Sequence, residues 1–479
     1  MTPPEPVTLQ LCLVSHTNVG KTTLTRTLLG AEVGEVRDAA HVTQQAEAHT
    51  LLHTDAGDRL LWWDTPGLGD SARLHRRLSQ AGNPLGWFLS QVWDRFRDPS
   101  FFLSQRAMLN ARDHADAVLY LVNASEAPQD AGYLAPELKI LGWMGKPVLV
   151  LLNQLGAPGE AGHQAAELAR WQRHLQPFAW VRAVLPLDAF SRCWVQEDAL
   201  FQALGPCLPA HQQAGHQRLV ERWWQVQLAR LARAMTAMAQ ALLRAAETQQ
   251  GAADGLADAL ARRVAEGQAA LTRDLLDLHG LHGEAGRPHW QSLQRSLLTL
   301  KTPTQVAHVG LLGAITSGAA TGLGADLLAG GLSMGAGAVV GAVVGAVTFA
   351  GAALAANRLR GVDVPSARLS LVAWRELVEV ALLTYLAVAH FGRGRGDFVD
   401  DGAPADWRGV VRAVVDAQAT ELAACHADMD DPLDGADVAE RLATLLGNLA
   451  LRALKHLYPT MDLRTAQRGL AQARSELSG

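Results

Sequence analysis

The residues with the clearest chemical potential form one short run near the N-terminus, SHTNVGKTT at positions 15–23. Its spacing of Gly20, Lys21 and Thr22 is typical of a phosphate-binding loop between a strand and a helix. Consecutive backbone N–H groups and a helix N-terminus converge there on an anionic oxygen. Lys21 offers a charge to the terminal phosphates and Thr22 a hydroxyl to Mg²⁺. Ser15 replaces the usual first glycine with another small residue. The alternative, a chance Gly-Lys-Thr turn, fits the flanking segments less well.

A second run, DTPG at positions 64–67, closes another apolar segment. An aspartate at the carboxyl end of a strand beside the loop can hold Mg²⁺ through water. The N–H of Gly67 can meet a γ-phosphate and sense its hydrolysis. Alone, this run would be an ordinary turn. Combined with the phosphate loop, it indicates a nucleoside triphosphate site with Asp64 as a metal residue.

The elements that position these residues are strands and helices in alternation. Gly30 ends a helix expected over 22–29. The alternation predicts an α/β P-loop NTPase domain with a parallel-rich sheet covered on both faces, over 7–206. Short apolar runs predict its buried strands at 8–15, 60–63, 117–122, 147–152 and 180–185.

From residue 212 the apolar spacing becomes helical and strand signals disappear. We expect a mainly α-helical C-terminal region in three parts: helices at 212–304, a Gly/Ala-rich helical hairpin at 305–360 and helices at 361–479. Individual helices are predicted over 216–249, 256–300, 369–391, 410–425 and 438–458.

The composition of the chain excludes several classes of protein and of binding site. The chain has 479 residues, 49% hydrophobic and 19% charged, with a formal charge of −5. It is therefore neither disordered nor fibrous, and no global basic field favours a nucleic-acid partner. The basic run GRGRG at 392–396 is short and acidic residues follow it. Four cysteines without a CxxC pair argue against a zinc site and for a reducing compartment. The first six residues lack the pattern of a signal peptide, so we expect a cytoplasmic protein.

The motifs NVGKTTL (18–24), LLG (28–30) and DTPGL (64–68) resemble those of the Era/TrmE-type translation-factor-related GTPases. The resemblance implies a Mg²⁺-dependent GTPase in which Thr43 contacts Mg²⁺ and the γ-phosphate; the alternative is a surface-loop threonine. It also implies that Asn18 helps to bind K⁺. Leu68 replaces a water-orienting glutamine, which implies slow hydrolysis that a cation, a partner or a homodimer accelerates.

The base-recognition motif departs from that family. Where the family has Asn-Lys-x-Asp, this chain has NQLG at 153–156, which keeps only Asn153. A missing aspartate removes a charge-assisted bidentate bond to guanine, so the choice between guanine and adenine stays open. Glu160 is the nearest acid that could compensate. In the loop after the fifth strand, LDA at 187–189, only Ala189 matches the family.

Residue by residue, the resemblance implies catalytic roles for Lys21, Thr43 and Gly67, and metal contacts for Thr22, Thr43 and Asp64. The implied nucleotide contacts are Ser15, His16, Thr17, Asn18, Val19, Gly20, Lys21, Thr22, Thr23, Asn153 and Ala189. The whole chain is similar to a bacterial group of GTPases that joins an Era-like G domain to a C-terminal domain of unknown function.

The glycine-rich tract supports two interpretations. Residues 309–329 carry one charge, Asp326, and 336–356 carry none. Each segment is long enough to cross the hydrocarbon core of a membrane, which takes about 20 residues in a helix. Small residues every four positions let helices pack closely. Flanking Lys301, Arg358 and Arg360 would then place both large domains, and both termini, in the cytoplasm at the inner membrane. The alternative is a helical hairpin buried within protein.

These features predict a GTP-binding switch with slow, regulated hydrolysis, whose helical region associates with a membrane or a membrane-protein partner through 309–356. Two alternatives remain: a scaffold that binds nucleotide without hydrolysing it, and a dynamin-like membrane-remodelling GTPase.

Overall fold

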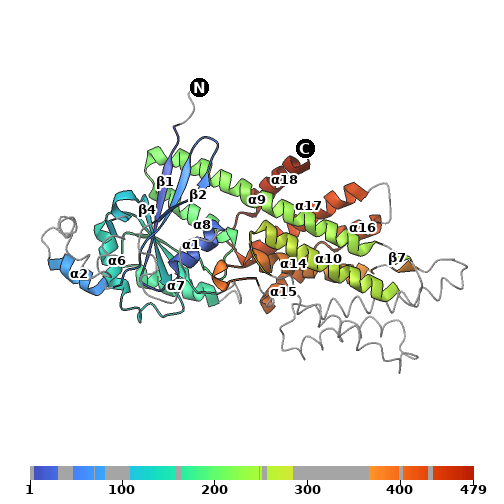
Figure 1. The fold of residues 1–479 in the computed structure, drawn as a ribbon, viewed down its shortest axis with the longest axis horizontal. Helices are drawn as coiled ribbons and strands as arrows, with labels where there is room; N and C mark the ends of the chain where they lie inside the picture. The colour runs from blue at the N-terminus through green and yellow to red at the C-terminus, as the bar shows by residue number, and fades with distance from the viewer. Residues whose placement is uncertain are drawn as a thin grey trace, which may run out of the picture. The chain divides into compact units, whose positions relative to one another are not determined.

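A computed structural model of the chain divides into two compact units, Met1–Gln227 with His390–Gly396, and Leu228–Ala389 with Asp397–Gly479. Figure 1 labels their elements. The residues that the structure describes are 5–30, 47–69, 71–80, 108–109, 111–156, 163–247, 249–250, 256–283, 366–367, 369, 371–398, 403–429 and 435–478. The 309–356 hairpin and Thr43 lie outside these residues, as does Glu160.

The first unit contains a six-stranded sheet in the order β2-β3-β1-β4-β5-β6. Every neighbouring pair is parallel except β2 and β3, which form an antiparallel hairpin. All five predicted strands are confirmed, and the mostly parallel fold with them. The strands are β1 (Thr8–Ser15), β2 (Glu47–His53), β3 (Arg59–Asp64), β4 (Ala117–Asn123), β5 (Val148–Asn153) and β6 (Val181–Pro186).

Strand β2 was not predicted, because its sequence EAHTLLH has no continuous apolar run. It occupies the edge of the sheet, where its described residues are exposed or half-buried. The central strands differ: β5 is buried along its whole length, which explains its uninterrupted VLVLLN sequence.

Helices cover the sheet of the first unit. One core cluster joins alternate residues of β1, β4 and β5 to α2, α6 and α7. The helix after the phosphate loop, α1, begins one residue before its predicted start and ends at the predicted one. The helices of this unit are α1 (Lys21–Leu29), α2 (Ser71–Gln80), α6 (Leu134–Trp143), α7 (His163–Leu175) and α8 (Trp194–Leu204), followed by η1 (Gly205–Cys207).

The turn between β2 and β3 is tied to the start of α9 (Ala210–Ala246). The buried carboxylate of Asp58 accepts from Arg218 Nε at 2.7 Å and from Arg218 Nη2 at 2.6 Å. It also accepts from the Thr54 hydroxyl at 2.7 Å and the Val7 N–H at 3.0 Å. The Arg218 hydrogen bond lowers the pKa of Asp58 to about 2. This ion pair holds one end of the sheet against the helix.

The second unit is mainly helical, as predicted, although the helix expected over 256–300 ends at Leu278. The single helix expected over 410–425 is wrong: the chain forms two helices that break at Ala417 and Gln418, where Gln418 leaves helical geometry. The helices of this unit are the later part of α9 with α10 (Leu256–Leu278), α14 (Leu371–Ala389), α15 (Ala405–Asp416), α16 (Ala419–Asp428), α17 (Gly435–Leu457) and α18 (Leu463–Ser478). A short ribbon joins β7 (Gln249–Gln250) to β8 (Ser366–Ala367).

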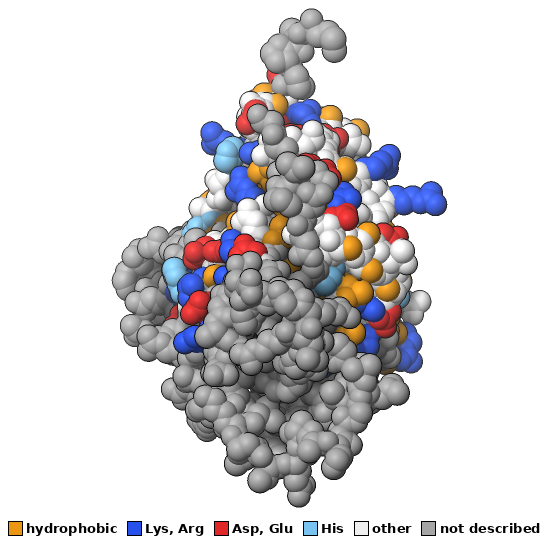
Figure 2. Space-filling model, turned by 90° about the vertical axis from the view of Figure 1, so that its right-hand side faces the viewer, with side chains coloured by type: hydrophobic (Ala, Val, Ile, Leu, Met, Phe, Trp, Pro, Cys, Tyr) orange, Lys and Arg blue, Asp and Glu red, His pale blue; other side chains and the backbone are white. Residues whose placement is uncertain are grey.

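Within the described residues, no helix combines the length and the apolar character that a membrane crossing requires. On the face in Figure 2, basic and acidic side chains are interspersed over the described part of the surface, in keeping with the near-balanced charge of the sequence.

Candidate nucleotide-binding site

The predicted phosphate loop connects β1 to α1 and turns tightly. Gly20, with φ of 95°, caps the N-terminus of α1, and Asn18 has φ of 64°. The side chain of Lys21 folds back into the turn, where its Nζ donates to Ser15 Oγ at 3.0 Å. Burial lowers the pKa of Lys21, and the nearby charges of Asp64 and Glu137 oppose that shift. The loop thus encloses a lysine amine beside a helix N-terminus, an arrangement suited to phosphate oxygens.

Thr22 and Asp64 meet at the edge of this loop. The Thr22 hydroxyl donates to Asp64 Oδ2 at 2.9 Å. Asp64 ends β3, the strand that pairs directly with β1. A hydroxyl and a carboxylate are oxygen donors of the kind that Mg²⁺ prefers. The pair therefore fits the metal position that the sequence assigned to it.

Gly67 lies against the same loop. A Cβ built at this glycine would be 3.1 Å from Lys21 Nζ and 3.0 Å from Thr17 Cγ2, so a larger residue would crowd the lysine. The next residue, Leu68, pairs with the loop through its backbone: its N–H donates to Ser15 O at 2.9 Å. Its side chain is fully buried in the core cluster. Position 68, where Leu68 points into the core, therefore provides no polar group that could orient a water molecule.

Asn153 joins three segments at the carboxyl edge of the sheet. Its Nδ2 donates to Val19 O in the phosphate loop at 2.7 Å, and its Oδ1 accepts from Ala189 N–H at 2.8 Å. The side chain is fully buried. One amide thus links the phosphate loop, the end of β5 and the loop after β6.

The buried carboxylate of Glu137 contacts the phosphate loop through His16, and this role was not predicted from the sequence. Glu137 on α6 is fully buried and contacts His16 Nδ1 at 2.7 Å. It also accepts from the Tyr120 hydroxyl at 2.6 Å. The His16 ring stacks on Tyr133 with centroids 4.3 Å apart. His16 and Glu137 are 121 positions apart, so only the fold brings them together.

A segment far along the chain, His390–Gly396, also belongs to the first unit. Its place there was not predicted from the sequence. Gly392 N–H donates to Phe190 O at 3.3 Å and Gly394 N–H to Ala189 O at 3.2 Å. A Cβ at Gly392 would lie 2.1 Å from Ala189 O. This close approach explains Gly392, and a Cβ at Gly394 would likewise lie 3.0 Å from Ala189 O; Gly396, the last glycine of the run GRGRG, instead has φ of 81°.

The structure thus gathers the predicted residues in two groups. The first, around the amine of Lys21, contains Ser15, Thr17, Thr22, Asp64 and Gly67. The second, around Asn153, contains Val19, Gly20 and Ala189. Thr23 lies on α1 beside Gly394, and Asn18 is exposed in the loop. Among the described residues, no cluster of three or more His, Cys, Asp or Glu side chains could hold a metal ion.

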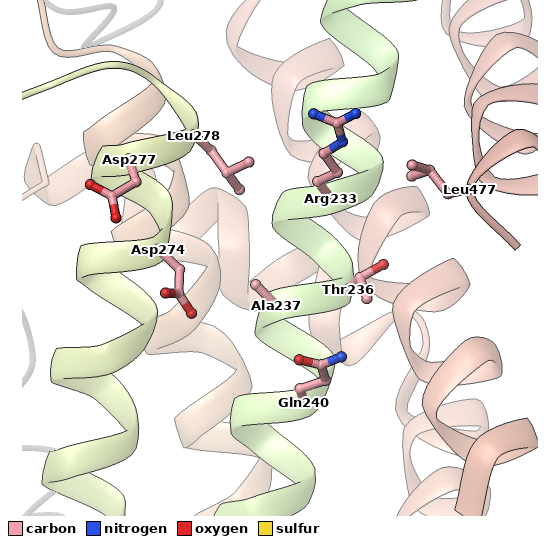
Figure 3. Close-up of a pocket in the computed structure, with 8 residues that line it drawn as sticks. All are labelled: Arg233, Thr236, Ala237, Gln240, Asp274, Asp277, Leu278 and Leu477. Carbon is pink, nitrogen blue, oxygen red and sulfur yellow. The ribbon is translucent and has the colours of Figure 1, made fainter.

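The second unit has a separate hollow of about 640 Å³, open to the surface. Figure 3 shows that side chains of α9, α10 and α18 line it, with Arg233 and Gln240 on one helix and Asp274 and Asp277 on another. It contains none of the predicted nucleotide residues.

Comparisons with known proteins match the two parts separately. The model of a family described as "50S ribosome-binding GTPase" matches residues 10–154. A "domain of unknown function (DUF3482)" matches residues 179–436.

Two solved structures of Era are similar to the chain. Era in complex with MgGDPNP and a fragment of 16S ribosomal RNA shares 18% identity over 43% of this chain, with a TM-score of 0.31. This chain spans 58% of that Era chain. An Era variant of Aquifex aeolicus bound to GDP and AlF4⁻ shares 14% identity over 57% of this chain and 90% of its own, also with a TM-score of 0.31.

Proposed function

The chain belongs to the family defined by the DUF3482 domain, joined here to an Era-like P-loop GTPase domain, and on this premise we propose that it is a slow, regulated GTP switch. The G domain supplies guanine-nucleotide binding. The observation that carries the proposal is the enclosed amine of Lys21, bounded by Ser15, by Gly67 and by the helix N-terminus at Gly20.

The proposed reaction is in-line attack of water on the γ-phosphate. Lys21 and the backbone N–H groups of 15–22 neutralise the charge that spreads over the phosphoryl oxygens. Thr22 and Asp64 would hold Mg²⁺, which supplies further charge neutralisation when bound. Thr43 and the N–H of Gly67 would couple the γ-phosphate to the order of the two switch segments.

Slow turnover is supported by Leu68. The side chain of Leu68 is apolar and buried in the core, so position 68 offers no group that orients the attacking water. We therefore propose that a cation, a partner protein or a second copy of the chain accelerates the reaction. K⁺ near Asn18 is the cation to test.

The test is nucleotide binding by the full chain, freed of bound nucleotide, with the variant Lys21→Ala. Lys139→Ala is the matched control, because Lys139 is exposed on α6. We expect Lys21→Ala to lose GTP affinity by about 100-fold, the loss of a charge-assisted phosphate contact, and the control to keep it. Release of phosphate, measured with Mg²⁺ in K⁺ or in Na⁺ buffer, then tests hydrolysis. Absence of Mg²⁺-dependent binding to the wild-type chain would refute the proposal.

A non-hydrolysing scaffold is the second candidate, and the burial of Leu68 also favours it. It predicts tight GTP binding with no phosphate release under any cation. Unchanged cellular function in Lys21→Ala would support a role that does not depend on the nucleotide.

The glycine-rich tract supports a cytoplasmic protein that associates with the inner membrane or with a membrane-protein partner. Its low charge and its small residues at four-residue intervals are the basis for this part of the proposal. Flotation of the full chain with liposomes, compared with a chain lacking 309–356, tests it. If both forms stay with the soluble fraction, the tract does not bind the membrane; dynamin-like remodelling would in addition require deformation of the liposomes.

A further inference from the structure

We propose that Asp188 reads the guanine base, in the place of the aspartate that is missing at position 156. This inference rests on the proposed function and extends it to the base specificity of the same site.

The carboxylate of Asp188 lies in the loop after β6 and touches the segment after β5. Its Oδ2 accepts from Gly156 N–H at 2.8 Å, and its Oδ1 accepts from Phe190 N–H at 2.8 Å. Asp188 is thus a carboxylate held within hydrogen-bond distance of the position where NQLG lacks its acid. The chain supplies the acid from a neighbouring loop.

This carboxylate belongs to the edge of the sheet that carries the phosphate loop. The next residue, Ala189, donates its N–H to Asn153, which in turn donates to Val19 of the loop. Ligands of open α/β sheets bind outside the carboxyl ends of the strands. With the phosphates at Lys21, the remainder of a nucleotide extends along this edge, where the loops after β5 and β6 lie.

Among the described residues, none packs against the Cβ position of Gly156. A Cβ built at Gly156 has no heavy atom within 4 Å among the described residues, and the residue is exposed. The buried carboxylate of Asp188 thus touches the backbone of a residue that is itself exposed. A residue with a long side chain at position 156 would occupy the space beside that Cβ position.

The electrostatic position of Asp188 also favours a ligand with donor groups. Asp188 is 2% exposed, and in the described part of the chain its carboxylate accepts from two neutral backbone N–H groups. An ionised carboxylate has about four acceptor positions, so two remain after these bonds. Buried charge is costly unless donors satisfy it. Guanine offers adjacent donors, N1–H and N2–H₂, whereas adenine presents an acceptor at N1.

The geometry therefore predicts that a carboxylate at 188 distinguishes purines by their Watson–Crick edge. GTP supplies two donors. ITP lacks the 2-amino group and supplies one. XTP places a carbonyl oxygen where GTP has the amino group and should be repelled by the carboxylate.

The first experiment needs no variant. Dissociation constants of GTP, ITP, ATP and XTP are measured for the nucleotide-free full chain with Mg²⁺. We expect GTP to bind about 10-fold or more tightly than ITP, because ITP lacks one hydrogen bond to a charged group. ATP and XTP should bind more weakly still.

The second experiment uses Asp188→Asn, with Asp130→Asn as the matched exposed control. An asparagine keeps one acceptor and adds a donor, which suits the carbonyl of xanthine. We expect the ratio of GTP to XTP affinity to fall by about 100-fold or more in Asp188→Asn, the exchange of two hydrogen bonds, and to stay unchanged in the control. Thermal unfolding of both variants reports whether the fold is kept.

The outcomes separate this inference from the proposed function. Equal binding of GTP, ITP and ATP by the wild-type chain overturns the role of Asp188 and leaves a nucleotide switch. An equal loss of GTP and XTP affinity in a folded Asp188→Asn also overturns it, since the carboxylate would then only brace Gly156. If the wild-type chain binds no nucleotide, the proposed function itself fails.

Discussion

Asn153 donates a hydrogen bond from its buried side-chain amide to the backbone carbonyl of Val19, 134 positions earlier in the chain, at 2.7 Å. The same amide group accepts from the N–H of Ala189. The phosphate loop and the loop after β6 therefore share one side chain.

Asn153→Ala should weaken both stability and nucleotide binding. It leaves the buried Val19 O and Ala189 N–H without this partner, at an expected cost of about 2 to 4 kcal/mol in the free energy of unfolding. Urea denaturation and GTP titration measure the two effects. Asn448→Ala, which removes contacts to Thr444 O and Gln467 in α17 and α18, is the control and should cost under about 1 kcal/mol. Equal effects in both variants would contradict the shared role of Asn153.

The loop, α1 and the central strands could be predicted because each is encoded locally. The run from Ser15 to Thr22 carries its own turn chemistry, and β1, β4 and β5 are continuous apolar runs. β2 could not be found in this way, because an edge strand with one exposed side has no such run. The break at Gln418 was missed because apolar spacing continues across it.

Contacts between residues far apart in the sequence could not be predicted from local sequence patterns. Glu137 lies on a helix whose sequence contains nothing that points to His16. Asp188 was visible as part of LDA at 187–189, but its relation to Gly156 depends on the pairing of β5 with β6. The run GRGRG at 392–396 was weighed as a basic motif, whereas the small size of Gly392 and Gly394 is what the contact with Ala189 requires.

Removal of the Arg218 side chain should destabilise the first unit and change its response to acid. The pKa of Asp58 is about 2, against an ordinary 3.8, so the interactions of its carboxylate, with the Arg218 hydrogen bond the largest, together contribute about 2 kcal/mol above pH 3.8. That contribution is lost as the pH falls through about 2. Arg218→Ala leaves the carboxylate buried without its cation, at a cost of about 3 kcal/mol near neutral pH, and should move the acid transition to higher pH.

Urea unfolding over a pH series measures this effect, with Arg222→Ala one turn later on α9 as the control. An acid transition that is the same in Arg218→Ala and in the wild-type chain would show that the Asp58 pair does not set it.

Ionisation of Glu376 on α14 should destabilise the second unit as the pH rises through neutrality. Burial first, and then the charge of Glu379, raise the pKa of Glu376 from 4.5 to about 7. The folded unit therefore binds the proton more tightly than the unfolded chain does. Its contribution to stability is complete below pH 4.5 and is lost as the pH rises through about 7.

Glu376→Gln should accordingly increase the free energy of unfolding at pH 8 by about 1 to 2 kcal/mol, after allowance for the partial exposure of the group. The variant should also flatten the pH profile. Denaturation at pH values between 5 and 8 measures this, and Glu440→Gln on the exposed side of α17 should leave the profile unchanged. A profile as steep in Glu376→Gln as in the wild-type chain would assign the slope to another group.

Gly392→Ala should disrupt the first unit, because the added Cβ would lie 2.1 Å from Ala189 O. We expect a loss of about 3 kcal/mol or more in the free energy of unfolding, together with weaker GTP binding through the displaced Ala189. Gly132→Ala is the control, since a Cβ there meets no heavy atom within 4 Å. Wild-type GTP affinity in Gly392→Ala would mean that the base-side loop tolerates displacement of this segment.

The return of His390–Gly396 to the first unit also constrains how the protein is made. All six strands of that unit have been synthesised by Pro186, yet the peptide that caps Ala189 and Phe190 is more than two hundred residues further along the chain. On the ribosome, the nucleotide-binding unit cannot form these contacts until most of the helical unit has been synthesised. A fragment that stops at residue 227 would therefore hold the whole sheet and still lack its last piece.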